Sequence, residues 1–194
     1  MAEGGSRSSS SPYCKIDNFL ADRENRRFLE LIYRNAARFE LSGTSTGEPN
    51  YRKSLVFYPP DECFPMLLKL IKSCLPFVTR ALGKNSFRVR EVDMQVTAHN
   101  DGDFFKIHTD RGGGRTRKRL ITFVYYLHRV PRPFTGGELI LHSPPVSKRG
   151  FAVEPSNNSI VFFRSEQEHA VRRVHCRSQK FEDSRFTING WICR

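Results

Sequence analysis

The sequence predicts an α+β protein in which two helices precede and cover a sheet sandwich or barrel. Three observations support this fold class. Apolar residues recur at helical spacing in two segments before residue 83. Beyond that point they alternate with polar residues, as in strands with one buried face. About eight short segments of this kind follow one another with no helical pattern between them, which excludes a repeating β-α-β fold.

The composition is typical of one soluble domain. The 194 residues include 32 Lys and Arg against 20 Asp and Glu, a formal net charge of +12. No apolar run reaches the length of a membrane span, and the first ten residues lack the apolar core of a signal peptide. The five cysteines are scattered and include no C-x-x-C pair. We therefore expect a cytoplasmic protein with no membrane partner, no disulfide framework and no zinc knuckle.

The chain begins with a segment that we exclude from the fold. Residues 1–12 are polar and of low complexity, which predicts a flexible tail. An amphipathic helix is predicted over Asp17–Phe39, because apolar side chains recur there at helical spacing. Residues 43–50 are rich in turn formers, and Tyr51–Tyr58 is predicted to be one strand that Pro59 ends.

A second helix is predicted to begin at Asp61-Glu62 and to end near Gly83. Pro76 lies inside this helix and should kink it. We expect residues 13–83 to form a helical support for the barrel. Residues 84–194 would form the barrel itself, within one domain overall.

The second half of the chain contains short β-branched or aromatic segments bounded by turn residues. Gly136-Gly137 is predicted to form a tight turn into the strand that follows, since glycine permits positive φ. The predicted strands are Phe87–Val89, Val92–Val96, Leu120–Leu127, Glu138–Leu141, Ser159–Phe163 and Arg185–Ile192.

Metal chemistry is indicated by His108 and Asp110. In an extended segment, this spacing places the imidazole and the carboxylate on the same face, where they can hold one ion together. A second histidine from a later strand would complete a set of two His and one carboxylate, which suits iron and leaves positions open for substrates. His169, just past a predicted strand, is the preferred third ligand. His175 is its competitor, because residues 171–176 could extend a strand and bring that imidazole inward.

With these residues in place, the chain resembles the Fe(II)/2-oxoglutarate-dependent oxygenases, in their prolyl-hydroxylase-like branch, over most of Lys15–Arg194. The segments that carry the resemblance are QVTAHNDGDFFKIHTD, RLITFVYYLHRVPRPFTGGELIL, VEPSNNSIVFFRSEQEHAV and DSRFTINGW. The resemblance implies a double-stranded β-helix, or jelly-roll, in which His108, Asp110 and His169 hold Fe(II). It also implies 2-oxoglutarate and O2 as cosubstrates, with ascorbate as an accessory.

The implied activity is hydroxylation of an unactivated C–H bond, with release of succinate and CO2. The resemblance favours a prolyl or other amino-acid residue as the target, in a peptide, a protein or an amino-acid-like substrate. A free amino acid and a natural-product intermediate remain open as alternatives. No residue beyond the metal ligands is expected to be catalytic.

Arg185 and Tyr126 match the family positions that bind the distal carboxylate of 2-oxoglutarate. A guanidinium can hold a carboxylate in a bidentate fork, which agrees with this role for Arg185. Arg172 and Arg173 remain alternative anchors, because the interval between His169 and Arg185 is longer than in well-known prolyl hydroxylases. Strand alternation places Thr187, Asn189 and Trp191 on the same face as Arg185.

The chain departs from the family at two positions, since His99 and Phe105 stand where tyrosines are usual. That substitution removes two hydroxyls from the pocket. We expect His99, Thr187 and Trp191 to line the substrate side, although a buried structural role for His99 is equally compatible with the sequence. Arg52 could meet a substrate carboxylate or backbone at the pocket mouth, or be a solvated charge on an edge strand.

Two other classes of protein stay open on the sequence alone. The basic, glycine-rich segment 111–119 could serve a non-enzymatic nucleic-acid-binding module. The nucleic-acid demethylase branch fits the charge, but the chain ends in RFTINGWICR and lacks the arginine-rich ending of that branch. A cupin-like barrel without metal is the remaining class. Nucleic acid is not our expected partner, and residues 111–119 and 171–184 are the loops expected to set specificity.

Overall fold

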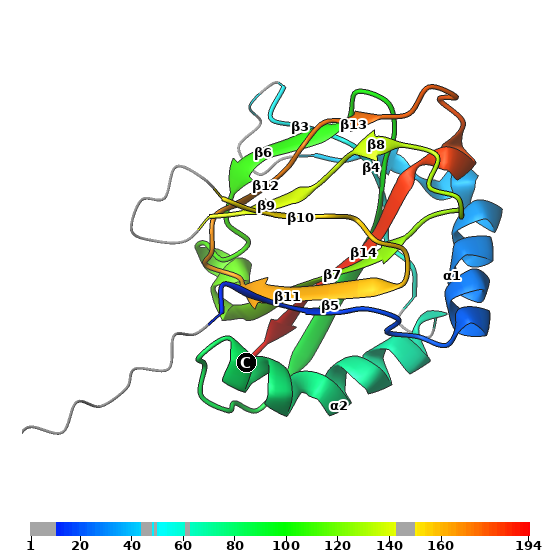
Figure 1. Cartoon of the computed structure of the whole chain (residues 1–194). Helices are drawn as coiled ribbons and strands as arrows, with labels where there is room; N and C mark the ends of the chain where they lie inside the picture. The colour runs from blue at the N-terminus through cyan, green and yellow to red at the C-terminus, as the bar shows by residue number, and fades with distance from the viewer. Residues whose placement is uncertain (1–10, 44–47, 49, 61–62, 143–149) are drawn as a thin grey trace, which may run out of the picture.

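Two antiparallel β-sheets face each other in the computed structural model, and two helices cover the outside of the larger sheet (Figure 1). The structure describes residues 11–43, 48, 50–60, 63–142 and 150–194. The predicted flexible tail therefore lies mostly outside the described residues, as do parts of the segment 43–50 and the predicted helix start at Asp61-Glu62. Within the part of the chain that the structure describes, no helix is long and apolar enough to cross a membrane.

The larger sheet has seven strands, of which the three central ones are nine residues long. Every pairing within it is antiparallel, so neighbouring strands can be joined without helical crossovers. The strands, in spatial order, are β1 (Tyr13–Ile16), β11 (Ser159–Arg164), β7 (Arg119–Leu127), β14 (Arg185–Cys193), β5 (Glu91–His99), β4 (Leu55–Phe57) and β2 (Glu40–Leu41).

The smaller sheet has five short strands and lies over the other face of the larger one (Figure 1). Its strands, in order, are β10 (Phe151–Val153), β9 (Leu139–Leu141), β12 (His169–Val171), β6 (Phe104–His108) and β3 (Arg52–Lys53). A separate two-stranded ribbon pairs β13 (Val174–His175) with β8 (Thr135–Gly136).

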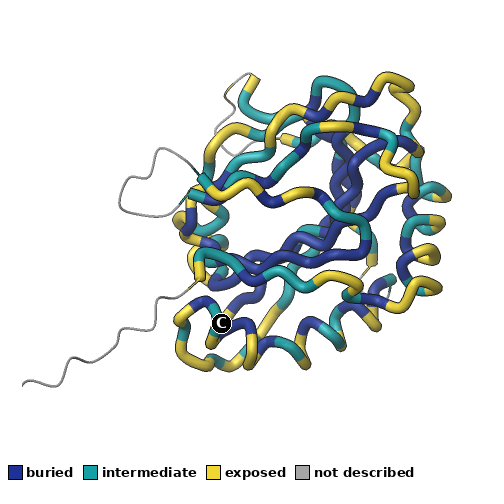
Figure 2. Tube along the Cα trace, in the orientation of Figure 1, coloured by how far each residue is buried: buried dark blue, intermediate teal, exposed yellow. Residues whose placement is uncertain are grey.

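Side chains alternate along β7 between the face of the larger sheet that packs on the helices and the face that packs on the smaller sheet. Phe123 and Tyr125 belong to the large core cluster, together with Phe28 and Ile32 of α1 (Asp22–Arg34). The same cluster includes apolar residues of α2 (Pro65–Ala81). Val124 and Tyr126, on the opposite face, pack with residues of β9 and β10 between the sheets. The deepest burial therefore follows the central strands (Figure 2).

Several elements differ from the sequence-based expectation. The first helix spans only Asp22–Arg34 of the predicted range, and a 3-10 turn follows it at Ala36–Arg38. Tyr13–Ile16 forms an edge strand on β11 that was not expected. The predicted strand Tyr51–Tyr58 is split at Ser54, so that β3 joins the smaller sheet and β4 the larger. Phe87–Val89 is not a strand, although both of its apolar residues pack against the main core.

Candidate functional site

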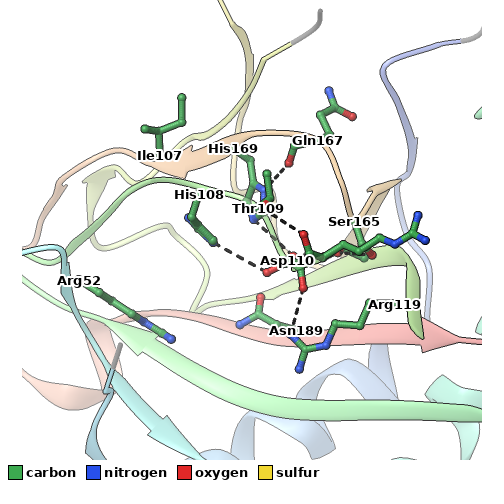
Figure 3. A network of polar contacts seen from close by, with 12 residues as sticks. Arg52, Ile107, His108, Thr109, Asp110, Arg119, Ser165, Gln167, His169 and Asn189 are labelled. Carbon is green, nitrogen blue, oxygen red and sulfur yellow. Dashed lines mark hydrogen bonds and ion pairs between the residues drawn. The ribbon is translucent and has the colours of Figure 1, made fainter. Parts of the chain in front are cut away.

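Three predicted metal ligands meet where β6 ends and β12 begins. His108 and His169 are directly opposed in the register of these two strands. Asp110 follows two residues later, and its amide donates a hydrogen bond to the carbonyl of Ser165 at 3.0 Å. Suitable ligand atoms of the three side chains lie within 4.8 Å of one another (Figure 3). Cross-strand pairing therefore brings together histidines that are far apart in the sequence.

Backbone carbonyls fix the orientation of both imidazoles. Nδ1 of His108 lies 2.8 Å from the carbonyl oxygen of Lys106, and Nδ1 of His169 lies 2.9 Å from that of Gln167. A carbonyl oxygen can only accept, so Nδ1 carries the proton in each ring. Each Nε2 then presents its lone pair toward Asp110, at 3.9 Å for His108 and 3.4 Å for His169. This is the arrangement that a pair of histidine ligands requires.

Two of the three side chains in this cluster carry the charge of a metal ligand. Burial lowers the pKa of His108 to about 4, and the nearby charge of His169 acts in the same direction. Burial alone would raise the pKa of Asp110, but His169, His108 and a 2.8 Å hydrogen bond from Thr122 outweigh it and lower that pKa. The aspartate is therefore ionised and His108 is neutral near pH 7. Both are the forms that bind metal.

A cavity of about 870 Å³ opens beside the three ligands. One face of β14 lines it with Arg185, Thr187, Asn189 and Trp191. The alternate residues Phe186, Ile188 and Ile192 enter the main core instead. The strand thus separates a polar face from an apolar one, as its sequence pattern predicts.

Buried polar atoms without partners concentrate in this cavity. Among the described residues, seven buried side-chain nitrogen or oxygen atoms lack a hydrogen-bond partner. Four of them belong to residues that line the cavity, and a fifth belongs to Tyr126, whose ring lies beside Arg185. The five are His99 Nε2, Tyr126 Oη, Arg185 Nε, Thr187 Oγ1 and Trp191 Nε1. Such atoms are costly to leave unpaired, and all five can donate a hydrogen bond. They fit a bound molecule rich in acceptor oxygens.

Arg185 lies at the deep end of the cavity, with only 2% of its surface exposed. Its guanidinium carbon is 5.1 Å from the ring centroid of Tyr126, whose pKa burial raises to about 12. Nη1 of Arg185 lies 3.4 Å from Nδ1 of His99, to which it can only donate. Nε2 of a neutral His99 then carries the proton and is a further unpaired donor. Burial, followed by the charges of Arg185 and Arg52, holds the pKa of His99 well below its usual value.

The alternatives left open by the sequence occupy other places. His175 is exposed on β13 and pairs with Thr135, so it is not part of the three-residue cluster. Arg172 and Arg173 are exposed as well, and the guanidinium of Arg173 lies over the ring of Phe104. Arg52 is half-buried and lines the cavity, so it is not a fully solvated edge charge.

Sequence reasoning missed three residues that shape the site. Thr122 and Ser165 hold Asp110 through its carboxylate and its amide, respectively. Arg119 lines the cavity, with its guanidinium carbon 3.7 Å from the ring centroid of Trp191. The signal for Thr122 was its position in the strand RLITFVYYL, where it alternates with Val124 and Tyr126 of the inner face. Alternation does not place Arg119 on that face, and the register between β7 and β14 shifts beside it. No local signal marks Ser165.

A family model described as the 2OG-Fe(II) oxygenase superfamily matches residues 94–193, which include every residue of the cluster. The chain is also 38% identical, over 191 residues, to an uncharacterized PKHD-type hydroxylase of Synechocystis sp.. The chain belongs to the 2OG-Fe(II) oxygenase superfamily. The match covers 93% of this oxygenase-family chain and 62% of the Synechocystis protein, so the chain spans less than two thirds of that relative.

Solved structures agree on the jelly-roll fold of the oxygenase superfamily. A prolyl-4-hydroxylase of Pseudomonas putida superposes with a TM-score of 0.73 at 20% identity, covering 94% of this chain and 92% of that one. A Trichoplax adhaerens prolyl hydroxylase, solved in complex with a hypoxia inducible factor peptide, gives a TM-score of 0.67, also at 20% identity. That match covers 94% of this chain and 83% of the other. The cofactors implied by the family are Fe(II), 2-oxoglutarate and O2, and the donor set described above fits them.

Proposed function

We propose that the protein is an Fe(II)- and 2-oxoglutarate-dependent dioxygenase that hydroxylates an unactivated C–H bond and releases succinate and CO2. The observation that carries this proposal is the cluster of His108, Asp110 and His169 beside a cavity that ends on a buried arginine. Two histidines and one carboxylate leave half of an octahedral iron open for other ligands. The fold is proposed to act as one domain, with residues 13–83 supporting the core of residues 84–194.

Each ligand is proposed to act in the form that the structure gives it. His108 and His169 would bind through Nε2, because their Nδ1 protons are donated to backbone carbonyls. Asp110 would bind as a carboxylate whose second oxygen is held by Thr122. Bound Fe(II) and 2-oxoglutarate supply the oxidative decarboxylation that activates dioxygen for insertion into a C–H bond.

Arg185 and Tyr126 are proposed to bind the distal carboxylate of 2-oxoglutarate. Arg185 is fully desolvated, and within the described chain it forms no ion pair with an acidic side chain. Its Nε and the hydroxyl of Tyr126 both lack a partner, so a carboxylate would satisfy them together. Thr187 and His99 offer two more donors along the same cavity. Ascorbate dependence stays a prediction.

The substrate is proposed to be a prolyl or other amino-acid residue, or an amino-acid-like molecule. The fold neighbours named above are prolyl hydroxylases, and one of them was solved with a peptide. Trp191, Thr187 and Arg52 line the cavity outside the deep carboxylate site and would contact that substrate. Cytoplasmic action is part of the same proposal.

An anaerobic optical titration tests the proposed function. We expect Fe(II) and 2-oxoglutarate together to produce a weak, saturable charge-transfer band in the visible region. The band should be lost in His108→Ala and Asp110→Ala while the far-UV circular dichroism stays that of the parent. His175→Ala is the matched control, because that histidine is exposed and outside the cluster, and its band should be unchanged. A full band in His108→Ala would contradict the metal assignment.

A further inference from the structure

Two guanidinium groups at the mouth of the cavity are not used by the metal or by 2-oxoglutarate. Arg52 comes from β3 in the smaller sheet, and Arg119 from the first position of β7 in the larger one. Both line the cavity. Figure 3 shows them reaching from opposite sides toward the space beside Asp110. Both arginines therefore line the same cavity as the three proposed metal ligands.

Aromatic rings and neutral acceptors hold both side chains in place. The guanidinium carbon of Arg52 lies 4.8 Å from the ring centroid of Phe105, and its Nε donates to Ser54 Oγ at 2.8 Å. Arg119 stacks on Trp191 at 3.7 Å and donates from Nη1 to the backbone carbonyl of Asp110 at 3.4 Å. These contacts fix the orientation of both guanidinium groups and leave further N–H donors available.

Neither guanidinium forms a recorded ion pair with a carboxylate in the part of the chain that the structure describes. Among the described residues, the recorded ion pairs of arginine involve Arg27, Arg111, Arg129 and Arg132, but not Arg52 or Arg119. Arg52 is half-buried, and its desolvation lowers its pKa, although Tyr58 and Asp110 act in the opposite direction. A desolvated charge without a counter-ion is costly, and an anion bound between the two guanidinium groups would offset that cost.

The remaining charges of the cavity do not supply that anion. Asp110 and Glu168 are the only acidic residues among those described that line it, and Asp110 belongs to the proposed metal site. Arg185 is matched to 2-oxoglutarate at the deep end. Glu168 lines the same cavity, and Glu91 and Asp93 line a neighbouring pocket with Arg119, but none of these carboxylates forms a recorded ion pair with Arg52 or Arg119 among the described residues.

We propose that the substrate carries an oxyanion, a carboxylate or a phosphate, close to the carbon that is hydroxylated, and that Arg52 and Arg119 bind it. This inference rests on the proposed function and narrows its substrate class. It favours a free or terminal amino-acid carboxylate, or an acidic group beside the target residue, over an internal residue with neutral neighbours. The net charge of +12 would assist the approach of such a molecule from a distance.

The single tryptophan of the chain makes the site directly observable, because Trp191 is the ring against which Arg119 stacks. The experiment uses the anaerobic protein with Fe(II) and 2-oxoglutarate bound, at constant ionic strength maintained with NaCl. Sulfate is titrated as a probe while Trp191 fluorescence and the charge-transfer band are recorded together. Acetate and methyl phosphate, titrated in the same way, distinguish a carboxylate from a phosphate preference.

We expect a saturable sulfate response that Arg52→Gln weakens about ten-fold or more, since a charge-assisted hydrogen bond is lost. Arg52→Gln leaves the tryptophan stack in place, so its baseline fluorescence is comparable with that of the parent. Arg115→Gln is the matched control. It removes the same charge from the exposed segment beside Arg119, and Arg115 does not line the cavity. Its affinity for sulfate should change less than two-fold.

The outcomes separate this inference from the proposed function. A normal band without saturable sulfate binding would overturn the inference alone. An equal loss of sulfate affinity in Arg115→Gln and Arg52→Gln would also overturn it, because sulfate would then be attracted by the net charge of the protein. Absence of the band in the parent protein would overturn the proposed function, and this inference with it.

Discussion

Several side chains at the deep end of the cavity have a hydrogen-bond donor without an acceptor in the described structure. His99, Tyr126, Thr187 and Arg185 each present an unpaired N–H or O–H within the described structure. The neutral state of His99 matters for this, because Arg185 donates to its Nδ1 and leaves Nε2 protonated. The deep end of the cavity is therefore suited to a carboxylate even without the hydroxyls that tyrosines at positions 99 and 105 would bring.

Arg185 is expected to dominate the affinity for 2-oxoglutarate. Arg185→Gln should raise the 2-oxoglutarate concentration at half-saturation of the charge-transfer band by roughly a hundred-fold or more, since a buried charge-assisted pair is lost. Arg173→Gln serves as the control, because Arg173 is exposed. An effect of Arg173→Gln as large as that of Arg185→Gln would show that the segment containing Arg173 binds the distal carboxylate of 2-oxoglutarate.

His99 is expected to make stability depend on pH. Its pKa is depressed in the folded state, so below about pH 6.5 the unfolded chain takes up a proton that the folded chain does not. The free energy of unfolding should therefore fall as the pH decreases below that value, by at most about 1.4 kcal/mol per pH unit for this residue. Urea unfolding of metal-free protein between pH 7.5 and 5.5 measures the slope.

His99→Gln should reduce that slope without abolishing it. The pKa values of His108 and His128 are lowered by burial as well, and those histidines contribute in the same direction. A slope equal to that of the parent protein would show that His99 is not held neutral.

The turn between β8 and β9 places a strand end against the buried arginine. Gly137 has φ +74°, and a Cβ atom there would lie 2.6 Å from Cδ of Arg185. Substitution of this glycine would thus combine unfavourable backbone geometry with displacement of the side chain proposed to bind 2-oxoglutarate.

Gly137→Ala should lower the free energy of unfolding by about 1–2 kcal/mol from the backbone conformation alone, with a further loss from the contact. It should also weaken 2-oxoglutarate binding. Gly113→Ala is the matched control, because that residue has φ −85° and no atom within 4 Å of a Cβ position. Thermal unfolding and the optical titration measure both effects. Equal behaviour of the two variants would contradict this account.

Elements with a strong local pattern were the ones that the sequence could predict. Residues 120–127, 159–163 and 185–192 all lie within observed strands, because their apolar runs are bounded by turn residues. The edge strand Tyr13–Ile16 has no such pattern and depends on its pairing with β11. The split of residues 51–58 between the two sheets depends on long-range packing, which spacing along the chain does not reveal.

The same distinction between local sequence patterns and long-range contacts applies to the residues of the site. His108 and Asp110 could be placed from a local spacing, and His169 from its position just past a predicted strand, while the family resemblance pointed to Arg185. Ser165 and Arg119 could not be identified in advance, because their roles come from contacts with residues that are distant in the sequence. Such contacts exist only once the register of the strands is fixed.

The whole molecule has one large core that joins both helices to the seven-stranded sheet, while the cavity lies on the other side of that sheet. A ligand that binds only the folded state therefore stabilises the entire molecule. Fe(II) and 2-oxoglutarate, added anaerobically to chelator-treated protein at about 100 times their dissociation constants, should each add about 2.7 kcal/mol, which makes about 5.4 kcal/mol together. For a chain of this size the melting temperature should rise by roughly 10–20 °C.

Calorimetry with and without these additions tests that expectation. In His108→Ala, Fe(II) should raise the melting temperature only slightly, because only two of the three proposed ligands remain. A shift as large as in the parent would place the stabilising metal elsewhere on the molecule.

The division of residues 52–57 between the two layers has a consequence for how such an enzyme can diversify. Only Ser54 separates the strand that carries Arg52 from the strand that joins the larger sheet, and its hydroxyl contacts both Arg52 and Ser42. This residue therefore fixes the position from which Arg52 reaches the cavity. A residue inserted here should displace Arg52 and leave His108, Asp110 and His169 in place, so that substrate selectivity can change independently of the proposed metal site.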